Sequence, residues 1–182
     1  RNLVKDVRER TISTADCSEF IRQRRRGFWY REYEHLYQAI DYASRFLHTL
    51  NETDLSMDSM SDGITKYCRT WFKLDQLYRK FFYHVSKPAQ VSLMEQLSQQ
   101  VENFYTNEYL LQVNNNWQQH VDDADKWEAA GITMQKRFFD KWVRSFPDND
   151  KKVCVIVSDA FRYEIGDEFL GLVRKEDRYD AE

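Results

Sequence analysis

A run of five apolar residues near the C-terminal end constrains the fold more than any other stretch of this sequence. Residues 153–157 read VCVIV, are mostly β-branched and contain no polar residue. A strand with one solvent-exposed face would show alternating polar and apolar residues. This pattern therefore predicts a strand buried on both faces, as in an α/β sheet. A lone strand cannot pair its own backbone groups, and it therefore needs neighbouring strands.

One strand and one helix, residues 151–182, follow the clearest break in the chain, the turn-forming segment PDND at residues 147–150. We place a domain boundary there, between a helical domain of residues 1–150 and the β-α edge of an α/β domain. Either a partner completes the sheet or the chain is part of a longer protein. The second is favoured, because the sequence starts at Arg1 without an initiator Met and stops at Glu182, where the next strand is expected.

Ser158 and Asp159 end the apolar run, at the expected carboxyl end of the strand. Open α/β sheets bind ligands beyond these ends, so Asp159 is well placed to hold a metal ion or to orient a phosphate. It can also simply cap the next helix by accepting hydrogen bonds from backbone N–H groups. P-loop chemistry is excluded because no G-x-x-x-x-G-K-[ST] motif is present. A haloacid-dehalogenase-type phosphatase is excluded because Phe161 stands where its second aspartate belongs.

The chain up to about Phe146 shows the three- and four-residue spacing of long amphipathic helices. The third of its apolar stripes changes phase near Asn107, where a bend or break is expected. Ser61 and Asp62 are expected to cap the second, and the short link that follows it makes the second and third helices antiparallel neighbours. The four stripes cover residues 29–50, 64–85, 94–121 and 134–146. The predicted fold class is mainly α, an antiparallel helical bundle followed by the first β-strand and helix of an α/β domain.

Aromatic residues make up 15% of the chain, and many of them stand on these stripes. At helical spacing we interpret them as core, because their large area holds helices together. The hydroxyls of the many tyrosines need partners or water at the rim of the core. This favours an aromatic-rimmed surface suited to docking another protein.

Charge and cysteine content indicate a cytoplasmic protein. A net charge of −3 gives no overall attraction to nucleic acid. Cys17, Cys68 and Cys154 are an odd number without C-x-x-C spacing, so neither a disulfide framework nor a zinc knuckle is indicated. No signal peptide is visible, and no apolar run approaches the roughly 20 residues that span a bilayer, so no membrane association is expected.

Basic residues gather in one dense cluster directly before Gly27. It could contact nucleic-acid phosphates, but it also suits a solvated helix end, where the macrodipole favours cations. Its members are Arg22, Arg24, Arg25 and Arg26.

The histidines stand singly on separate predicted helices, with no pair at i, i+4, so a histidine metal site is not expected. They are His35, His48, His84 and His120.

The residues around Asp159 resemble a known family. The stretch VIVSDAFRYEIGDEF, residues 155–169, is similar to the first strand, metal-ligand aspartate and first helix of the PglZ family, the alkaline-phosphatase-like proteins of BREX phage-defence systems, whose members typically read S-D-A-[LF]-R-Y-E. Residues 73–81 and 104–110 are similar to the helical region that precedes this domain in PglZ.

This resemblance implies a metal-dependent phosphatase or phosphodiesterase, with two divalent ions of zinc or manganese type and a Ser or Thr nucleophile. From that set only Asp159 carries over, as a metal ligand. Arg162 and Glu164 match the motif, and their roles stay open between facing a phosphate and forming ion pairs. Ser158 matches too, but we interpret it as a turn hydroxyl. The nucleophile and the other ligands are expected beyond Glu182, so the chain alone is expected to be inert and without bound metal.

Two classes of function stay open. In the first, the chain belongs to a hydrolase whose helical region docks other BREX proteins. Whether nucleic acid is its substrate stays open. In the second, it is a non-catalytic helical scaffold for protein–protein interaction. A nucleophile followed by Asp and His ligands after Glu182 would distinguish the hydrolase from the scaffold.

Overall fold

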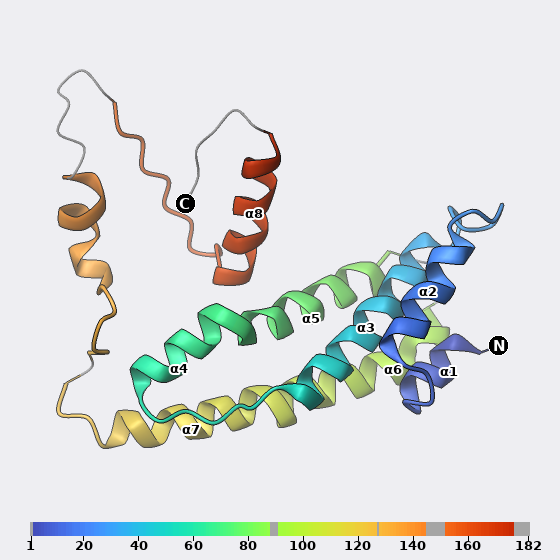
Figure 1. Cartoon of the computed structure of the whole chain (residues 1–182), viewed down its shortest axis with the longest axis horizontal. Helices are drawn as coiled ribbons and strands as arrows, with labels where there is room; N and C mark the ends of the chain where they lie inside the picture. Colours follow the sequence, from blue (N-terminus) through green and yellow to red (C-terminus); the bar gives the residue numbers. More distant parts are fainter. Residues whose placement is uncertain (1, 88–90, 127, 145–151, 177–182) are drawn as a thin grey trace.

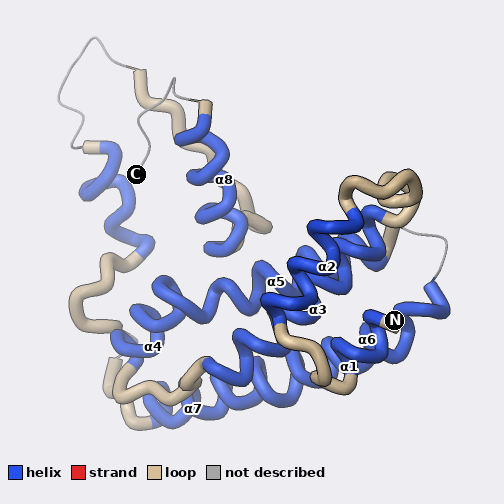
Figure 2. Tube along the Cα trace, turned by 45° about the vertical axis from the view of Figure 1, so that its right-hand side comes forward, coloured by secondary structure: helices blue, strands red, loops and turns tan. Residues whose placement is uncertain are grey.

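The computed structural model describes residues 2–87, 91–126, 128–144 and 152–176. Within these ranges the protein is mainly α and contains no β-strand (Figure 2). The α-helices are α1 (Leu3–Arg8), α2 (Thr14–Arg24), α3 (Glu34–Glu52), α4 (Met60–Lys66), α5 (Phe72–Val85), α6 (Val91–Asn103), α7 (Leu111–Asp122) and α8 (Tyr163–Lys175). Shorter turns are η1 (Tyr67–Trp71), η2 (Phe104–Leu110) and η4 (Phe139–Val143), which are π-helical, and the 3₁₀ turn η3 (Gln135–Arg137).

Two long rods form the frame of the bundle. Helices α4, η1 and α5 follow one another in the first rod, and α6, η2 and α7 return antiparallel to it in the second (Figure 1). The antiparallel arrangement expected from the short link is confirmed. Helix α3 packs mainly on α5, α2 packs on α3, and α1 closes one side against α3 and α6. The cluster of buried apolar residues runs from Leu3 to Tyr109, so the bundle core is closed without the C-terminal part of the chain.

The first rod begins at a different cap from the one expected. Ser59 is the N-cap of α4, and its side-chain oxygen accepts a hydrogen bond from the Asp62 N–H at 3.1 Å. The expectation that Ser61 caps the helix is wrong, because Ser61 already lies inside the first turn. Asp62 does contribute there, since its carboxylate lies 2.9 Å from Lys66 Nζ, one turn along.

The first stripe starts later than its spacing predicts. Helix α3 begins at Glu34, and residues 25–33 form successive turns in which Tyr30 N–H bonds to the Gly27 carbonyl at 3.1 Å. Tyr30 enters the core and stacks on Tyr37, with ring centroids 5.6 Å apart. Trp29, one residue earlier, is 64% exposed, so its assignment to the core was wrong.

The predicted change of phase near Asn107 is confirmed, and its cause is the π-helical segment η2. A π turn holds one residue more than an α turn, which rotates everything after it relative to the core. Tyr105 and Tyr109 are therefore buried, whereas Leu110, which was expected on the stripe, is 42% exposed.

The fourth predicted helix is replaced by short turns. Only η3 and η4 form between residues 134 and 144, and Phe138 and Trp142 are 45% and 54% exposed. Within the described residues these side chains thus gain little burial that would stabilise a long helix. Phe146 and the boundary segment 147–150 lie outside the described residues.

The predicted buried strand does not form among the described residues. Residues 152–157 are extended, but Ile156 and Val157 are 92% and 84% exposed. A strand requires a hydrogen-bonded neighbour, and the described part of the chain supplies none. The helix after it does form as α8, although Phe169 on its apolar stripe is 57% exposed.

Candidate functional site

The Ser158-Asp159 pair lies in the turn that connects the extended segment to α8. The Phe161 N–H bonds to the Ser158 carbonyl at 3.3 Å, and the Arg162 N–H bonds to the Ala160 carbonyl at 3.0 Å. Helix α8 has Arg162 as its N-cap, without a side-chain capping bond. Asp159 therefore does not cap α8, and its carboxylate is exposed at the turn.

Glu164, the last residue of the motif, is fully buried where α8 meets α5. Its Oε1 lies 3.4 Å from Arg162 Nε and 3.8 Å from Arg79 Nε. Its backbone carbonyl accepts a hydrogen bond from Gln76 Nε2 at 3.3 Å. Neither carboxylate oxygen has a hydrogen-bond partner within the described residues, so the two guanidinium groups provide the compensating charge.

A second carboxylate on α8 extends this contact by one turn. Glu168 accepts a hydrogen bond from Arg79 Nη2 at 2.6 Å and lies 2.9 Å from Lys80 Nζ. Partial burial opposes ionisation of Glu168, but the hydrogen bonds from Lys80 and Arg79 outweigh it and lower the pKa of the carboxyl group. Arg79 thus bridges two carboxylates of α8, one buried and one partly exposed. We call Arg79, Lys80, Glu164 and Glu168 the α5–α8 anchor.

Tyr163 adds an aromatic contact beside the anchor. Its ring meets Phe72 edge-on at 5.3 Å and Tyr67 at 5.9 Å between centroids. Its hydroxyl donates to the Cys68 carbonyl at 3.1 Å. Tyr163 and Glu164 therefore contact η1 and α5, and Arg162 pairs with Glu164, while Ser158 and Asp159 lie exposed at the turn.

A buried carboxylate of the bundle lies close to the anchor. Asp75 on α5 accepts hydrogen bonds from the Tyr67 hydroxyl at 2.7 Å and from the Tyr105 hydroxyl at 2.9 Å. Burial raises the pKa of Asp75, with a further increase from the charge of Glu164, and the two tyrosine bonds only partly offset this. Burial and the bond to Asp75 raise the pKa of Tyr67 far above its ordinary value. The tyrosines therefore act as neutral donors to Asp75.

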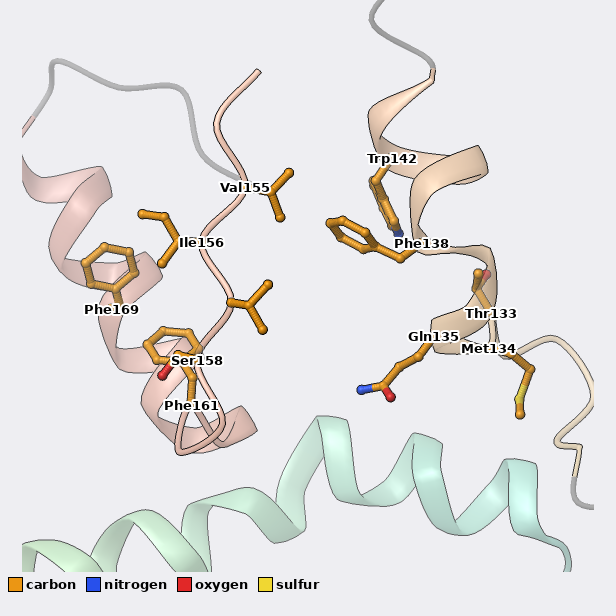
Figure 3. Close-up of a pocket in the computed structure, with 11 residues that line it drawn as sticks. Thr133, Met134, Gln135, Phe138, Trp142, Val155, Ile156, Ser158, Phe161 and Phe169 are labelled. Atoms are coloured by element: carbon orange, nitrogen blue, oxygen red, sulfur yellow. The ribbon is translucent and has the colours of Figure 1, made fainter. Parts of the chain in front are cut away.

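An apolar cleft of about 830 Å³ lies between residues 133–142 and the extended segment (Figure 3). Phe138 points across it toward Val155, with Trp142 beside Phe138, while Ile156 points to the side of Phe169. Among the described residues that line the cleft none is acidic or basic, and Asp159 is not one of them. The described lining is therefore mostly apolar, and its polar side chains are those of Thr133, Gln135 and Ser158.

Two histidines that are distant in the sequence meet in the structure. His35 Nδ1 and His84 Nδ1 lie 2.8 Å apart, between α3 and α5. Burial and the charge of His35 lower the pKa of His84. Within the described ranges no three His, Cys, Asp or Glu side chains come close enough to hold a metal ion, and Asp159 has no second ligand beside it. The described residues therefore do not fit a complete two-metal site.

Comparison with known proteins shows what the chain is similar to. Residues 138–182 match the family model described as the BREX system PglZ alkaline phosphatase-like domain. The resemblance seen in the sequence is thereby confirmed, and the chain is a relative of the PglZ alkaline phosphatase-like proteins. No solved structure matches it.

Two curated relatives extend the match over most of the chain. The alkaline phosphatase-like protein BrxZ of Escherichia coli O9:H4 (strain HS) is 29% identical over 94% of the chain. The alkaline phosphatase-like protein PglZ of Bacillus cereus (strain H3081.97) is 29% identical over 87% of it. The chain spans about a fifth of the length of these relatives, 21% of BrxZ and 19% of PglZ. In the described part, no helix is long and apolar enough to cross a membrane.

Sequence reasoning did not find Asp75, Arg79 or Glu168. A signal for Asp75 was present, because it stands four residues after Trp71 and three before Tyr78, on an otherwise apolar stripe. A carboxylate in that position is either paired or functional. Arg79 gave no such signal, since its partners lie 85 and 89 residues away in the chain.

Proposed function

We propose that this chain is the helical platform and first active-site edge of a metal-dependent phosphoester hydrolase, and that Asp159 supplies one ligand to its metal site. The observation that carries the proposal is the division of the motif in space. Arg162, Tyr163 and Glu164 are engaged with each other or with the bundle, and Glu164 is fully buried, whereas Asp159 stays exposed at the turn. A motif built in this way fixes α8 and leaves one carboxylate available for a ligand.

The charge of the anchor explains why the motif needs these residue types. Burying a carboxylate without a cation costs free energy. The burial of Glu164 therefore favours the placement of α8 in which Arg79 and Arg162 flank this carboxylate. Glu168 then holds Arg79 in place from the other side. The turn that bears Asp159 begins only a few residues before this fixed point. Rigid support of that kind is what a metal ligand requires.

Asp159→Ala tests the proposal in the complete protein that carries this chain. We expect loss of at least one order of magnitude in divalent-metal affinity, measured by titration with Zn²⁺ or Mn²⁺, and loss of metal-dependent hydrolysis of a p-nitrophenyl phosphate ester. Asp167→Ala, an exposed carboxylate on α8, is the matched control and should change neither quantity. Unchanged metal affinity in Asp159→Ala would refute the assignment. The isolated chain should release no p-nitrophenol, because its described residues hold no complete metal site.

Docking of another BREX protein is a second candidate role, and uncovered leucines of the second rod favour it. Leu93, Leu110 and Leu111 are 43%, 42% and 50% exposed, in a bundle whose other large aliphatic residues are mostly buried. The substitutions Leu110→Ser and Leu111→Ser together should abolish co-purification with BREX proteins while the circular dichroism stays helical. Retained co-purification would show that the docking surface does not include Leu110 and Leu111.

A further inference from the structure

The last turn of α2 and the loop that follows it combine charge and exposed rings in a way that the hydrolase proposal does not use. Residues 22–31 read RQRRRGFWYR, with five arginines and no acidic residue in a chain whose net charge is −3. The loop projects from the end of the bundle (Figure 1). We call residues 22–31 the arginine–aromatic loop.

Two aromatic side chains of this loop are held outside the core. Phe28 is 89% exposed and Trp29 is 64% exposed, and their rings meet edge-on at 5.1 Å. The base of the loop is fixed, because Tyr30 is buried and its hydroxyl accepts a hydrogen bond from Gln38 Nε2 at 3.3 Å. The exposure of both rings is therefore a feature of the folded bundle and not of a loose end.

The arginines fall into two groups. Arg22 donates to Glu19 at 2.8 Å through Nε, and the Arg24 guanidinium lies 4.9 Å above the Phe20 ring. The other three, Arg25, Arg26 and Arg31, are exposed and form no ion pair within the described residues. The α2 macrodipole acts within the last turn and so does not explain Arg31 or the exposed rings.

We propose that the arginine–aromatic loop binds single-stranded nucleic acid, with Arg25, Arg26 and Arg31 on phosphates and with Phe28 and Trp29 stacked on bases. Proteins that bind single strands without sequence preference combine these two elements, since every base offers a flat face and every nucleotide a charge. A duplex keeps its bases stacked and gives the rings no partner. This inference does not depend on Asp159 or on hydrolysis.

The test measures the binding of a fluorescein-labelled 15-nucleotide oligothymidylate to the whole chain. Binding is monitored by fluorescence anisotropy at several salt concentrations. Contact with three phosphates predicts a slope of log K against log salt of about −2, and the pair Arg25→Gln and Arg26→Gln should reduce its magnitude by about 1.4. The pair Phe28→Ala and Trp29→Ala should weaken binding at least about fivefold with the slope unchanged, because only stacking is lost.

A matched control removes the same charge elsewhere. Arg69 and Lys73 are exposed on η1 and α5, and their joint replacement by Gln should change the affinity less than about twofold. The proposal is overturned if the loop variants bind the oligonucleotide as tightly as the unmodified chain does. It is also overturned if a duplex of equal length binds at least as tightly, or if polyglutamate competes as well as oligothymidylate. The last result would assign the loop to an acidic protein surface.

Discussion

Asp75 shows how this bundle keeps a carboxylate inside its core. Its two oxygens are satisfied by the hydroxyls of Tyr67 and Tyr105 and not by a cation. Tyr105 also stacks on Tyr78, with 3.6 Å between ring centroids, which fixes the hydroxyl that faces Asp75. Neutral hydroxyl donors satisfy the hydrogen-bonding capacity of the carboxylate, but they stabilise its negative charge less than a cation would. Ionised Asp75 therefore remains a cost to the folded state.

This cost predicts a pH dependence with a definite sign. Burial raises the folded-state pKa of Asp75 above the ordinary value of 3.8, so the folded protein binds this proton more tightly than the unfolded chain. Its contribution to the free energy of unfolding should then fall as pH rises from about 4 through the raised pKa, by up to about 1.4 kcal/mol per pH unit. Asp75→Asn should remove this fall, as measured by urea unfolding from pH 3.5 to 7.

Asp167→Asn, which changes an exposed carboxylate of α8, serves as the control and should retain the full dependence. Glu168 contributes with the opposite sign, because its pKa is lowered and its stabilisation is lost as pH falls. The comparison of Asp75→Asn with the unmodified chain isolates Asp75 from that effect. If the two chains showed parallel pH profiles, Asp75 would not be the titrating group.

At the residue scale, the ion pair of Arg162 with Glu164, one of the two roles expected for these residues, is present, whereas Asp159 as a metal ligand stays a prediction. Asp159 was found from its position after an apolar run, which is local information. The burial of Glu164 could not be found in that way, because it depends on Arg79 in a helix that is far away in the chain. Ionic contacts between distant elements leave no periodic signal.

At the scale of elements, the π-helical segments decide which residues reach the core. Segment η2 rotates α7 so that Asn116 Nδ2 bonds to the Leu55 carbonyl and the His120 ring to the Met57 carbonyl, each at 3.0 Å. These bonds tie α7 to the segment between α3 and α4. A regular α-helix through residues 104–110 would present a different face to that segment.

Deletion of Asn107 should convert η2 into regular α-helix and rotate α7 by about 100°. Both hydrogen bonds to the α3–α4 connection would be lost, at about 1 kcal/mol each, so we expect destabilisation of about 2 kcal/mol or more in chemical unfolding. Asn107→Ala keeps the length of the helix and removes an exposed side chain, so it should stay within about 0.5 kcal/mol of the unmodified chain. Equal stability of the deletion and the substitution would show that the extra residue has no role in register.

Periodicity located the long rods because their apolar stripes pack on one another. It failed at residues 25–33, where consecutive turns bring Tyr30 and not Trp29 into the core. It also failed for residues 153–157, because apolar content predicts a strand only when a neighbour is available. In both cases the missing information was the packing partner, and no local pattern contains it.

At the scale of the whole molecule, we expect the bundle to fold without the motif. The cluster of buried apolar residues ends at Tyr109, and the anchor attaches α8 from outside that core. A chain of residues 1–150 should therefore be helical by circular dichroism, melt cooperatively and show the same melting temperature with and without EDTA. A melt that shifted with EDTA would mean that a metal stabilises the bundle itself.

The anchor is tested most directly by amide hydrogen exchange along α8. A helix of 13 residues is marginally stable in water by itself, so protection in α8 reports its attachment to α5. We predict that α8 is protected in the unmodified chain and loses this protection in Arg79→Met, while the protection of α3 is the same in the two proteins. The control Lys73→Met changes an exposed residue of α5, the helix that carries Arg79, and should leave α8 protected. Rapid exchange of α8 in the unmodified chain, or full protection in Arg79→Met, would contradict the anchored platform.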